Sequence, residues 1–140
     1  MALTYHPTPG EIVLCDYGTG FVAPEMVKRR PVVIISPRLR RRGDLVSVVP
    51  LSTTEPAPVE NHHCRLALAV ALPRPFHNKV MWAKCDMLAT VSLGRLDRFR
   101  AGRGAGARKF VTGSLTADQL REVRRGVLHA LGLASLTVHL

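Results

Sequence analysis

Residues able to perform chemistry are spread over three stretches of the sequence. Arg30 stands before a proline, Ser52 and Thr53 end an apolar run, and Lys84 and Asp86 lie two positions apart. A guanidinium can bind two phosphate oxygens at once. A carboxylate can take a proton from a ribose 2'-hydroxyl while cations and hydroxyls stabilise the charge that develops on the phosphate. This set of side chains would therefore suit the cleavage of an RNA phosphodiester.

Each of these features also has a structural interpretation. The cations at 28–30 could be a solvated cluster beside a core strand, and hydroxyls at strand ends commonly cap turns. Alternation places Trp82 on the same strand face as Lys84 and Asp86. There the ring could stack on a base, or it could belong to the core beside a surface ion pair. Taken one at a time, the hydroxyls and the Lys84–Asp86 pair favour the structural interpretation, and the cationic cluster leaves both open.

The strand that positions Arg30 is expected over 31–36. Val32–Ile35 are all β-branched, which favours a strand, and they show no polar alternation, which indicates burial on both faces. The flanking prolines cannot donate to a sheet and so limit the pairing. Lys28, Arg29 and Arg30 are therefore expected at the lip of a rigid strand.

Five further strands are expected from apolar or alternating runs, and the connector between the second and third strands is basic. That connector contains Gly43-Asp44, which supplies turn chemistry, so Arg38, Arg40 and Arg41 should crowd the tip of an antiparallel hairpin. Glu25 lies in a non-helical loop between the first two strands. The other strands are expected over 11–17, 45–51, 63–68, 79–86 and 108–112.

A C-terminal helix has the clearest local signature. Thr116 and Gln119 fit a capping box, Leu115 and Leu120 fit a hydrophobic staple, and apolar residues recur at helical spacing as far as residue 131. Gly132 is a suitable stop. Segment 92–99 could hold one helical turn, while 1–9, 101–107 and 133–140 are expected to be an arm, a mobile loop and a tail.

Composition narrows the function classes. Twenty Lys and Arg against ten Asp and Glu give a formal net charge of +10, which favours a polyanionic partner such as nucleic acid. No apolar run approaches the roughly 20 residues of a membrane helix, and no secretory signal is evident. A cytoplasmic protein without membrane contact is therefore expected.

The three cysteines, Cys15, Cys64 and Cys85, are expected to be reduced core thiols. The sequence His62-His63-Cys64 invites a metal interpretation. Adjacent residues on a strand point to opposite faces, however, and no second ligand cluster follows at zinc spacing. The sequence therefore predicts no metal site.

The order of elements predicts a single domain over 1–140. Strands followed by one helix, without βαβ alternation, argue against a parallel sheet. The expected fold is mainly β, an α+β class with a small, strongly bent antiparallel sheet or barrel and the C-terminal helix packed on it. The sequence has no P-loop, dinucleotide-binding glycine pattern or nucleophile elbow.

The motifs, taken in order, resemble the MazF/PemK family of toxin endoribonucleases, and in particular its Kid-like branch. The resemblance covers roughly residues 9–131. It is carried by Gly10-Glu11-Ile12-Val13 with Asp16-Tyr17, by Glu25 five positions before Arg30, by Arg30-Pro31 through Ser36-Pro37, by Val49-Pro50-Leu51-Ser52-Thr53 and by Lys84-Cys85-Asp86.

This resemblance implies an SH3-like barrel, a homodimer, a cognate antitoxin, and cleavage of single-stranded RNA such as mRNA without a metal or other cofactor. By position, Arg30 would hold the scissile phosphate or act as the acid. Ser52 and Thr53 would donate to phosphate oxygens, and Asp86 would be the general base, with Lys84 where that branch has arginine. The products would be a 2',3'-cyclic phosphate and a 5'-hydroxyl.

The remaining expected contacts are basic or aromatic, except for Glu25, which would orient the loop or the arginine. These substrate contacts are Lys28, Arg29, Arg38, Arg40, Arg41 and Trp82.

The alternative is a non-catalytic SH3-like module that binds nucleic acid or a protein, as toxins of the CcdB type do, or an inactive toxin relative. Lys84 lacks the guanidinium fork, the loop 17–30 has no histidine where the Kid-like branch has one, and position 52 is serine where many members have threonine. These departures leave the general acid open.

Overall fold

The computed structural model describes residues 2–104 and 107–140. None of the helices in this part of the chain has the length and apolar character to cross a membrane. The elements are β1 (Glu11–Asp16), β2 (Arg29–Ile34), β3 (Leu45–Ser52), β4 (His63–Ala67), β5 (Val80–Lys84), η1 (Cys85–Met87), β6 (Ala89–Ser92), η2 (Leu93–Arg95), β7 (Leu96–Asp97), β8 (Phe99–Gly104), β9 (Ala107–Val111), β10 (Gly113–Ser114), α1 (Ala117–Ala130) and η3 (Ala134–His139), where η marks a 3-10 helix.

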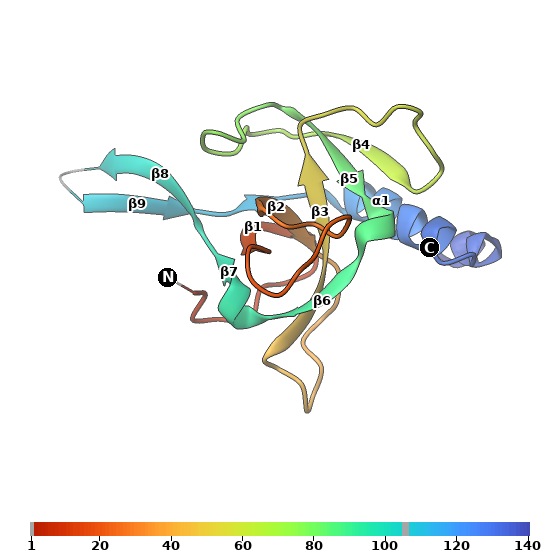
Figure 1. Ribbon diagram of the computed structural model, residues 1–140, viewed down its shortest axis with the longest axis horizontal. Helices are drawn as coiled ribbons and strands as arrows, with labels where there is room; N and C mark the ends of the chain where they lie inside the picture. The colour runs from red at the N-terminus through yellow and green to blue at the C-terminus, as the bar shows by residue number, and fades with distance from the viewer. Residues whose placement is uncertain (1, 105–106) are drawn as a thin grey trace.

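The main sheet is antiparallel, with strand order β10-β1-β2-β3-β5-β4, β6 beside β3 and β7 beside β1. β3 runs through its centre (Figure 1), pairing with β6 through residues 45–48 and with β5 through residues 51–52. The predicted mainly β, α+β class with a C-terminal helix is confirmed. The sheet is bent but not closed, because β10 and β4 stand at opposite ends of the order of described strands.

The predicted strands agree with the structure to within about two residues at each end, with one consequence for the site. β5 ends at Lys84, because Cys85–Met87 turn into η1. Asp86 therefore does not continue the alternation of Trp82 and Lys84, and its predicted place on that strand is wrong. The helical turn expected within 92–99 is confirmed as η2.

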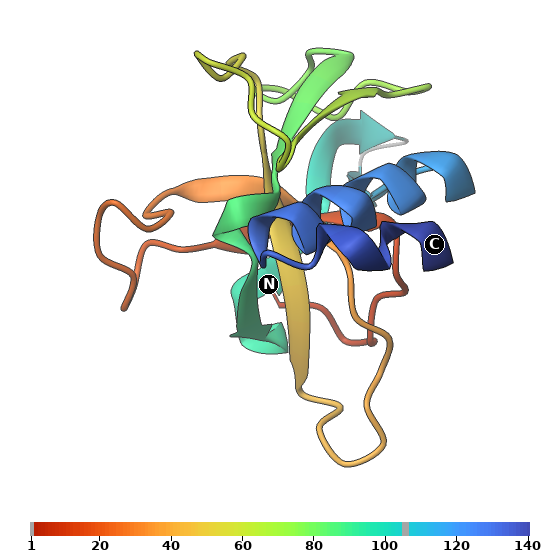
Figure 2. The same cartoon turned by 90° about the vertical axis from the view of Figure 1, so that its right-hand side faces the viewer.

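Two segments expected to be irregular have regular structure. Part of the predicted loop 101–107 belongs to the β8–β9 hairpin, which pairs only within itself, while residues 105–106 lie outside the described part. The tail forms η3, which folds back along α1 (Figure 2). The sequence did not predict this hairpin, because its glycines and arginines show no apolar alternation. Its strands are held by backbone pairing instead. The arm packs, since the Leu3 N–H donates to the Leu96 oxygen at 2.9 Å.

Alternation along β1 and β2 separates two apolar cores on opposite faces of the sheet. The pair Ile12 and Val33 belongs to the helix-side core, which Val123 of α1 covers. The pair Val13 and Val32 belongs to the loop-side core, on which residues of the β1–β2 loop pack. Figure 2 shows this loop and α1 on opposite sides of the sheet.

The predicted capping box of α1 is confirmed. The Gln119 N–H donates to Thr116 Oγ1 at 3.1 Å, and the Thr116 N–H donates to Gln119 Oε1 at 3.0 Å. The Gln119 side-chain amide also donates to the Ala67 oxygen at 2.7 Å, which ties the helix to the end of β4. Gly132, at φ +74°, ends the helix in the left-handed region, as its sequence position predicts.

Gly126 lets α1 approach η1 closely. A Cβ at this position would lie 2.6 Å from Cys85 Sγ and 3.3 Å from the His62 oxygen. Both distances are shorter than ordinary van der Waals contacts, and Cys85 is buried. The absence of a side chain at position 126 is therefore a packing requirement at the point where α1, η1 and the segment before β4 meet.

The substitution Gly126→Ala is expected to destabilise the fold, although in a helix interior alanine is normally more stabilising than glycine. Overpacking of this kind costs about 1–3 kcal/mol, and the midpoint of thermal unfolding should fall by several degrees. Thermal unfolding followed by circular dichroism measures this. Gly94→Ala is the control, because its Cβ would meet only Ser92 Oγ, at 3.4 Å. A variant at position 126 as stable as wild type would contradict this account of the joint.

Candidate active site

Strand register places three predicted site residues side by side. The β2–β3 pairing ends at Val32 and Pro50, and continuing its register two residues further directs Arg30 of β2 toward Ser52 of β3. Ser52 pairs in turn with Trp82 of β5. Residues directly opposite each other in antiparallel strands share a face, with Cβ atoms about 5 Å apart. These three side chains therefore form one row on the loop-side face, at the open end of the β2–β3 hairpin.

Arg30 is the half-buried cation of this row. Its Nε is buried and makes no hydrogen bond within the described part of the chain. A buried polar atom without a partner is unusual in a folded protein and calls for an explanation. An anion bound by the outer N–H groups of the guanidinium would compensate the charge of this partly desolvated side chain.

The hydroxyl of Ser52 is buried, 7% exposed, and accepts the N–H of Thr54 at 3.1 Å. Because that contact uses only a lone pair of the oxygen, the hydroxyl proton stays available to a phosphate oxygen beside Arg30. Thr53 follows the end of β3 and is half-buried. The structural role expected of strand-end hydroxyls and the phosphate-binding role are thus compatible in Ser52.

Lys84 extends the same face beyond the row. It lies two positions from Trp82 on β5 and pairs with His63 of β4. Arg65 of β4 pairs with Trp82 and is exposed, so a further cation stands at the end of the row. Trp82 is only 8% exposed and offers little ring surface on which a base could stack.

Asp86 is presented by η1, immediately after β5. The Cys85 N–H donates to the His62 oxygen at 3.1 Å, and Cys85 Sγ lies 3.5 Å from the Val123 oxygen, so Cys85 faces α1. The next side chain in the turn, Asp86, is 49% exposed, with Oδ2 at 3.6 Å from His62 Nε2. The carboxylate thus reaches solvent near Lys84 despite the end of the strand.

Two histidines, which the sequence suggested only as metal ligands, stand beside this carboxylate. The ring centroids of His62 and His63 are 4.3 Å apart, and His63 Nδ1 accepts the Glu60 N–H at 2.9 Å. Burial, followed by the neighbouring His62, lowers the pKa of His63. His63 is therefore a neutral imidazole that carries its proton on Nε2. The sequence held no signal for this arrangement, because the segments that carry His62 and Asp86 are brought together only by the pairing of β4 with β5.

Ligand atoms of His62, His63 and Asp86 all lie within 4.8 Å of one another. The argument that adjacent residues diverge does not hold here, because His62 precedes β4. The donor set nevertheless does not fit a metal. A metal-bound imidazole normally donates its second N–H outward, whereas His63 Nδ1 accepts a backbone N–H. The ammonium of the paired Lys84 adds positive charge, and Cys64 belongs to the helix-side core.

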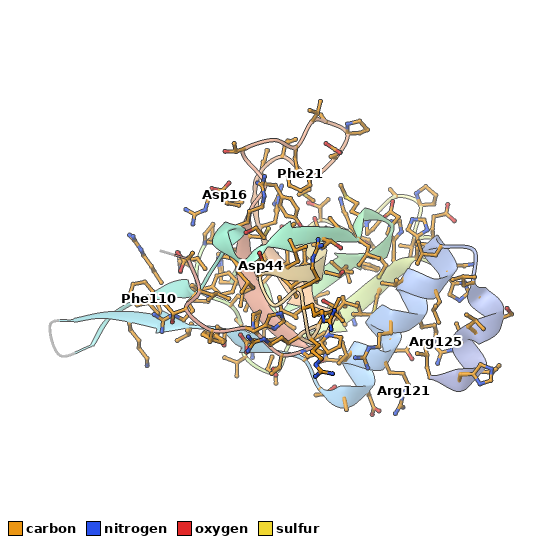
Figure 3. The ribbon with its side chains drawn as sticks, turned by 90° about the horizontal axis from the view of Figure 1, so that it is seen from below. Asp16, Phe21, Asp44, Phe110, Arg121 and Arg125 are labelled. Carbon is orange, nitrogen blue, oxygen red and sulfur yellow. The ribbon has the colours of Figure 1, made fainter. Side chains whose placement is uncertain are left out.

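The loop between β1 and β2 is fixed next to Arg30 by aromatic contacts. Phe21 packs edge-to-face on Tyr17, with centroids 5.0 Å apart, and lies under the Arg95 guanidinium at 4.8 Å. Arg95 also donates to the Asp16 oxygen at 3.1 Å, and Figure 3 shows Phe21 in the loop that follows Asp16. The Glu25 carboxylate accepts the N–H of Val22 in the same loop, so its hydrogen bond shapes the loop itself.

The predicted hairpin tip is confirmed as basic and exposed, but it is far from the row. β3 has eight residues and ends at Ser52, so seven steps of about 3.3 Å, about 23 Å in all, separate its tip end from Ser52. In the single chain, the structure therefore does not bring the tip residues together with Arg30. These exposed cations are Arg38, Arg40 and Arg41.

Lys28 and Arg29 are exposed beside Arg30, and Arg29 lines a separate cleft of about 490 Å³. Three more arginines, Arg74, Arg98 and Arg100, line the same cleft. Sequence reasoning missed these three because they lie on a loop and a hairpin that only the fold brings beside β2. Because Arg29 alternates with Arg30 along β2 and the cleft is lined by helix-side residues such as Leu14 and Phe99, this basic cleft opens on the opposite face of the sheet from the row.

The cysteines are core residues. All three are free and buried, which confirms the prediction of reduced core thiols. Burial raises the pKa of Cys15 and of Cys85 to about 12, and that of Cys64 to about 11. A thiol with so high a pKa is not a nucleophile at neutral pH, so the cysteines are structural residues of the core.

Comparison with known proteins gives a consistent assignment. Residues 8–131 match the family described as PemK-like, MazF-like toxin of type II toxin-antitoxin system. The YifN protein of Escherichia coli (strain K12) is 29% identical, in an alignment covering 97% of this chain and 99% of YifN. A protein of Haemophilus influenzae is also 29% identical, covering 97% of this chain and 98% of the relative.

Solved structures share the fold. MazF (Form-I) from Deinococcus radiodurans superposes with a TM-score of 0.62 at 20% identity, covering 91% of this chain and 98% of that chain. Mycobacterium tuberculosis toxin MazF-mt6 gives 0.58 at 20% identity, covering 87% and 96%. MazE-MazF (Form-II) from Deinococcus radiodurans gives 0.55 at 20% identity, covering 92% and 98%.

Proposed function

The chain belongs to the PemK-like, MazF-like toxins of type II toxin-antitoxin systems, and on this premise we propose that it is an endoribonuclease that cleaves single-stranded RNA, including mRNA, without a metal ion. The observation that carries the proposal is the row on the loop-side face. A guanidinium with an unpartnered buried Nε stands opposite a serine hydroxyl, at the edge of a chain with net charge +10. Such a pair suits a single phosphate group.

In the proposed reaction, Asp86 takes the proton of a ribose 2'-hydroxyl. The 2'-oxygen forms its bond to phosphorus, the bond from phosphorus to the 5'-oxygen breaks, and the leaving oxygen takes a proton from water. Arg30 and Lys84 stabilise the charge that builds up on the phosphate, and the hydroxyls of Ser52 and Thr53 donate to its oxygens. The products are a 2',3'-cyclic phosphate and a 5'-hydroxyl.

The geometry supports this division of roles. β2 and β5 flank β3, so their axes are about 10 Å apart, and Arg30 and Lys84 project from the same face. Two long cationic side chains can approach one phosphodiester from the two sides of such a gap. Asp86 reaches solvent at the η1 end of the same strand pair.

We expect the purified protein to cut a long single-stranded RNA in the presence of EDTA, because every proposed role belongs to a side chain. Sequencing of the fragments and treatment of their 3' ends with a phosphatase that opens cyclic phosphates identify the cut sites and the products. Binding with steep salt dependence but no cleavage would favour the alternative, a non-catalytic nucleic-acid-binding module. RNA cleaved only when a divalent ion is added would contradict the metal-independent mechanism.

We also propose that the toxin acts in the cytoplasm as a homodimer and is neutralised by a cognate antitoxin. Membership of a toxin-antitoxin family supports the antitoxin, and a solved structure of the same fold is titled an endoribonuclease in complex with its cognate antitoxin, from Mycobacterial species. The cleft lined by Arg29, Arg74, Arg98 and Arg100 adds to the positive charge that attracts RNA to the chain.

A further inference from the structure

His62 is joined twice to the turn that carries Asp86. Its backbone oxygen accepts the N–H of Cys85, the residue before Asp86, at 3.1 Å. Its ring nitrogen Nε2 lies 3.6 Å from Asp86 Oδ2. A surface ion pair between two mobile side chains would need only the second contact. The backbone link holds the two segments in register whether or not the side chains touch, so the geometry of the pair is built into the fold.

The helix closes this joint from behind. Because Gly126 has no side chain, α1 packs against Cys85 and the His62 oxygen together. The His62 side chain is 28% exposed, whereas that of Asp86 is 49% exposed. The ring therefore lies deeper than the carboxylate, on the protein side of it, and the carboxylate faces outward. A group in that position can support the carboxylate without blocking its access to RNA.

Several titratable side chains surround the His62 ring, and among them the ring of His62 is the one that approaches Asp86. The ring of His63 lies tilted beside that of His62 but is held neutral, with Nδ1 accepting the Glu60 N–H. Lys84 pairs with His63 across the strands. From α1, three further titratable or charged side chains line the adjoining pocket with His63, namely Glu122, Arg125 and His129.

We propose that His62 is a positioning residue for Asp86: its Nε2–H holds Oδ2, so that Oδ1 is the oxygen turned to the 2'-hydroxyl of the RNA. The inference rests on the proposed nuclease function and adds to it a residue from the segment before β4. The 3.6 Å separation is long for a hydrogen bond, and contacts of this kind tighten when the substrate binds. The proton of the 2'-hydroxyl still passes to Asp86. His62 therefore changes the orientation of the Asp86 carboxylate and takes no part in the proton transfer.

The test compares His62→Leu, which removes the donor, with His62→Gln, which keeps an N–H donor. The full-length chain is assayed at saturating and limiting concentrations of a short RNA that contains one mapped cut site. His62→Leu should lower kcat by about 10- to 100-fold, the range for a hydrogen bond to a charged group, and leave KM within about twofold. His62→Gln should recover most of the loss, and His77→Leu, in an exposed loop, should cleave as wild type does.

Two kinetic results would overturn the inference. One is a His62→Leu variant as fast as wild type; the other is an equal loss in the leucine and glutamine variants, which would indicate packing alone. An independent measurement is the ¹⁵N chemical shift of His62 Nε2 in the full-length chain, which should change on Asp86→Asn if the two groups are bonded. An unchanged shift would also overturn it. A wild-type chain that cuts no RNA would overturn the proposed function and, with it, the role of His62, whereas a cutting wild type with an indifferent His62 overturns the positioning role alone.

Discussion

Arg30→Ala is expected to lower the rate of RNA cleavage by about 10³-fold while the protein stays folded. The loss follows from removing the donor aimed at the phosphate on which charge develops, a change that typically costs 10²–10³ in rate. Stability should be retained, because Arg30 Nε has no partner in the described part of the chain and its removal leaves no protein group unsatisfied. The variant therefore separates catalysis from folding.

Two matched variants sharpen this test. Arg30→Lys keeps the charge but loses the planar fork, so it should recover only a small part of the activity. Arg121→Ala removes the same charge from the exposed face of α1 (Figure 3), where Arg121 forms an exposed ion pair with Asp118. That variant should cut RNA at close to the wild-type rate. If Arg30→Ala cleaved RNA as fast as Arg121→Ala, the scissile phosphate would have to bind elsewhere.

Asp86→Asn is expected to have the second large effect, a loss of cleavage of about 10²–10⁴-fold, the usual contribution of a general base. Asparagine has nearly the same shape and keeps an oxygen near His62, so binding of RNA should persist while the proton of the 2'-hydroxyl has no acceptor. Single-turnover rates and a separate measurement of RNA affinity distinguish these two steps. The expected pattern is a low rate with an affinity close to that of wild type.

Asp118→Asn is the control for this change, because it removes an exposed carboxylate from the start of α1. It should leave the single-turnover rate unchanged. Comparable rates for Asp86→Asn and wild type would place the base elsewhere and leave Asp86 as a structural partner of His62. Thermal unfolding of both variants checks that neither change acts through folding.

Much of the fold was accessible from local patterns. The β-branched run 32–35 gave β2, and the capping box at Thr116 gave the start of α1. The hairpin of β2 and β3 followed from a turn signal between two apolar runs. These features depend on residues near one another in the chain, where propensity and periodicity act directly.

What could not be predicted depends on segments distant in sequence. The alternation of Trp82 and Lys84 suggested that Asp86 continued the strand, but η1 begins because Cys85 turns toward α1 and bonds to the His62 segment. The placement of His62 beside Asp86 has the same origin. The tip cations were expected near the site because of their charge, whereas the length of β3 separates the tip from Ser52.

The close contact at Gly126 couples α1 to the turn η1, which carries Asp86. The turn that presents Asp86 rests on the helix at a position without a side chain, so lifting or bending the helix there would displace the carboxylate on the other side. On the proposed mechanism, a protein bound to α1 would therefore inhibit cleavage by displacing Asp86, without covering the face on which RNA binds.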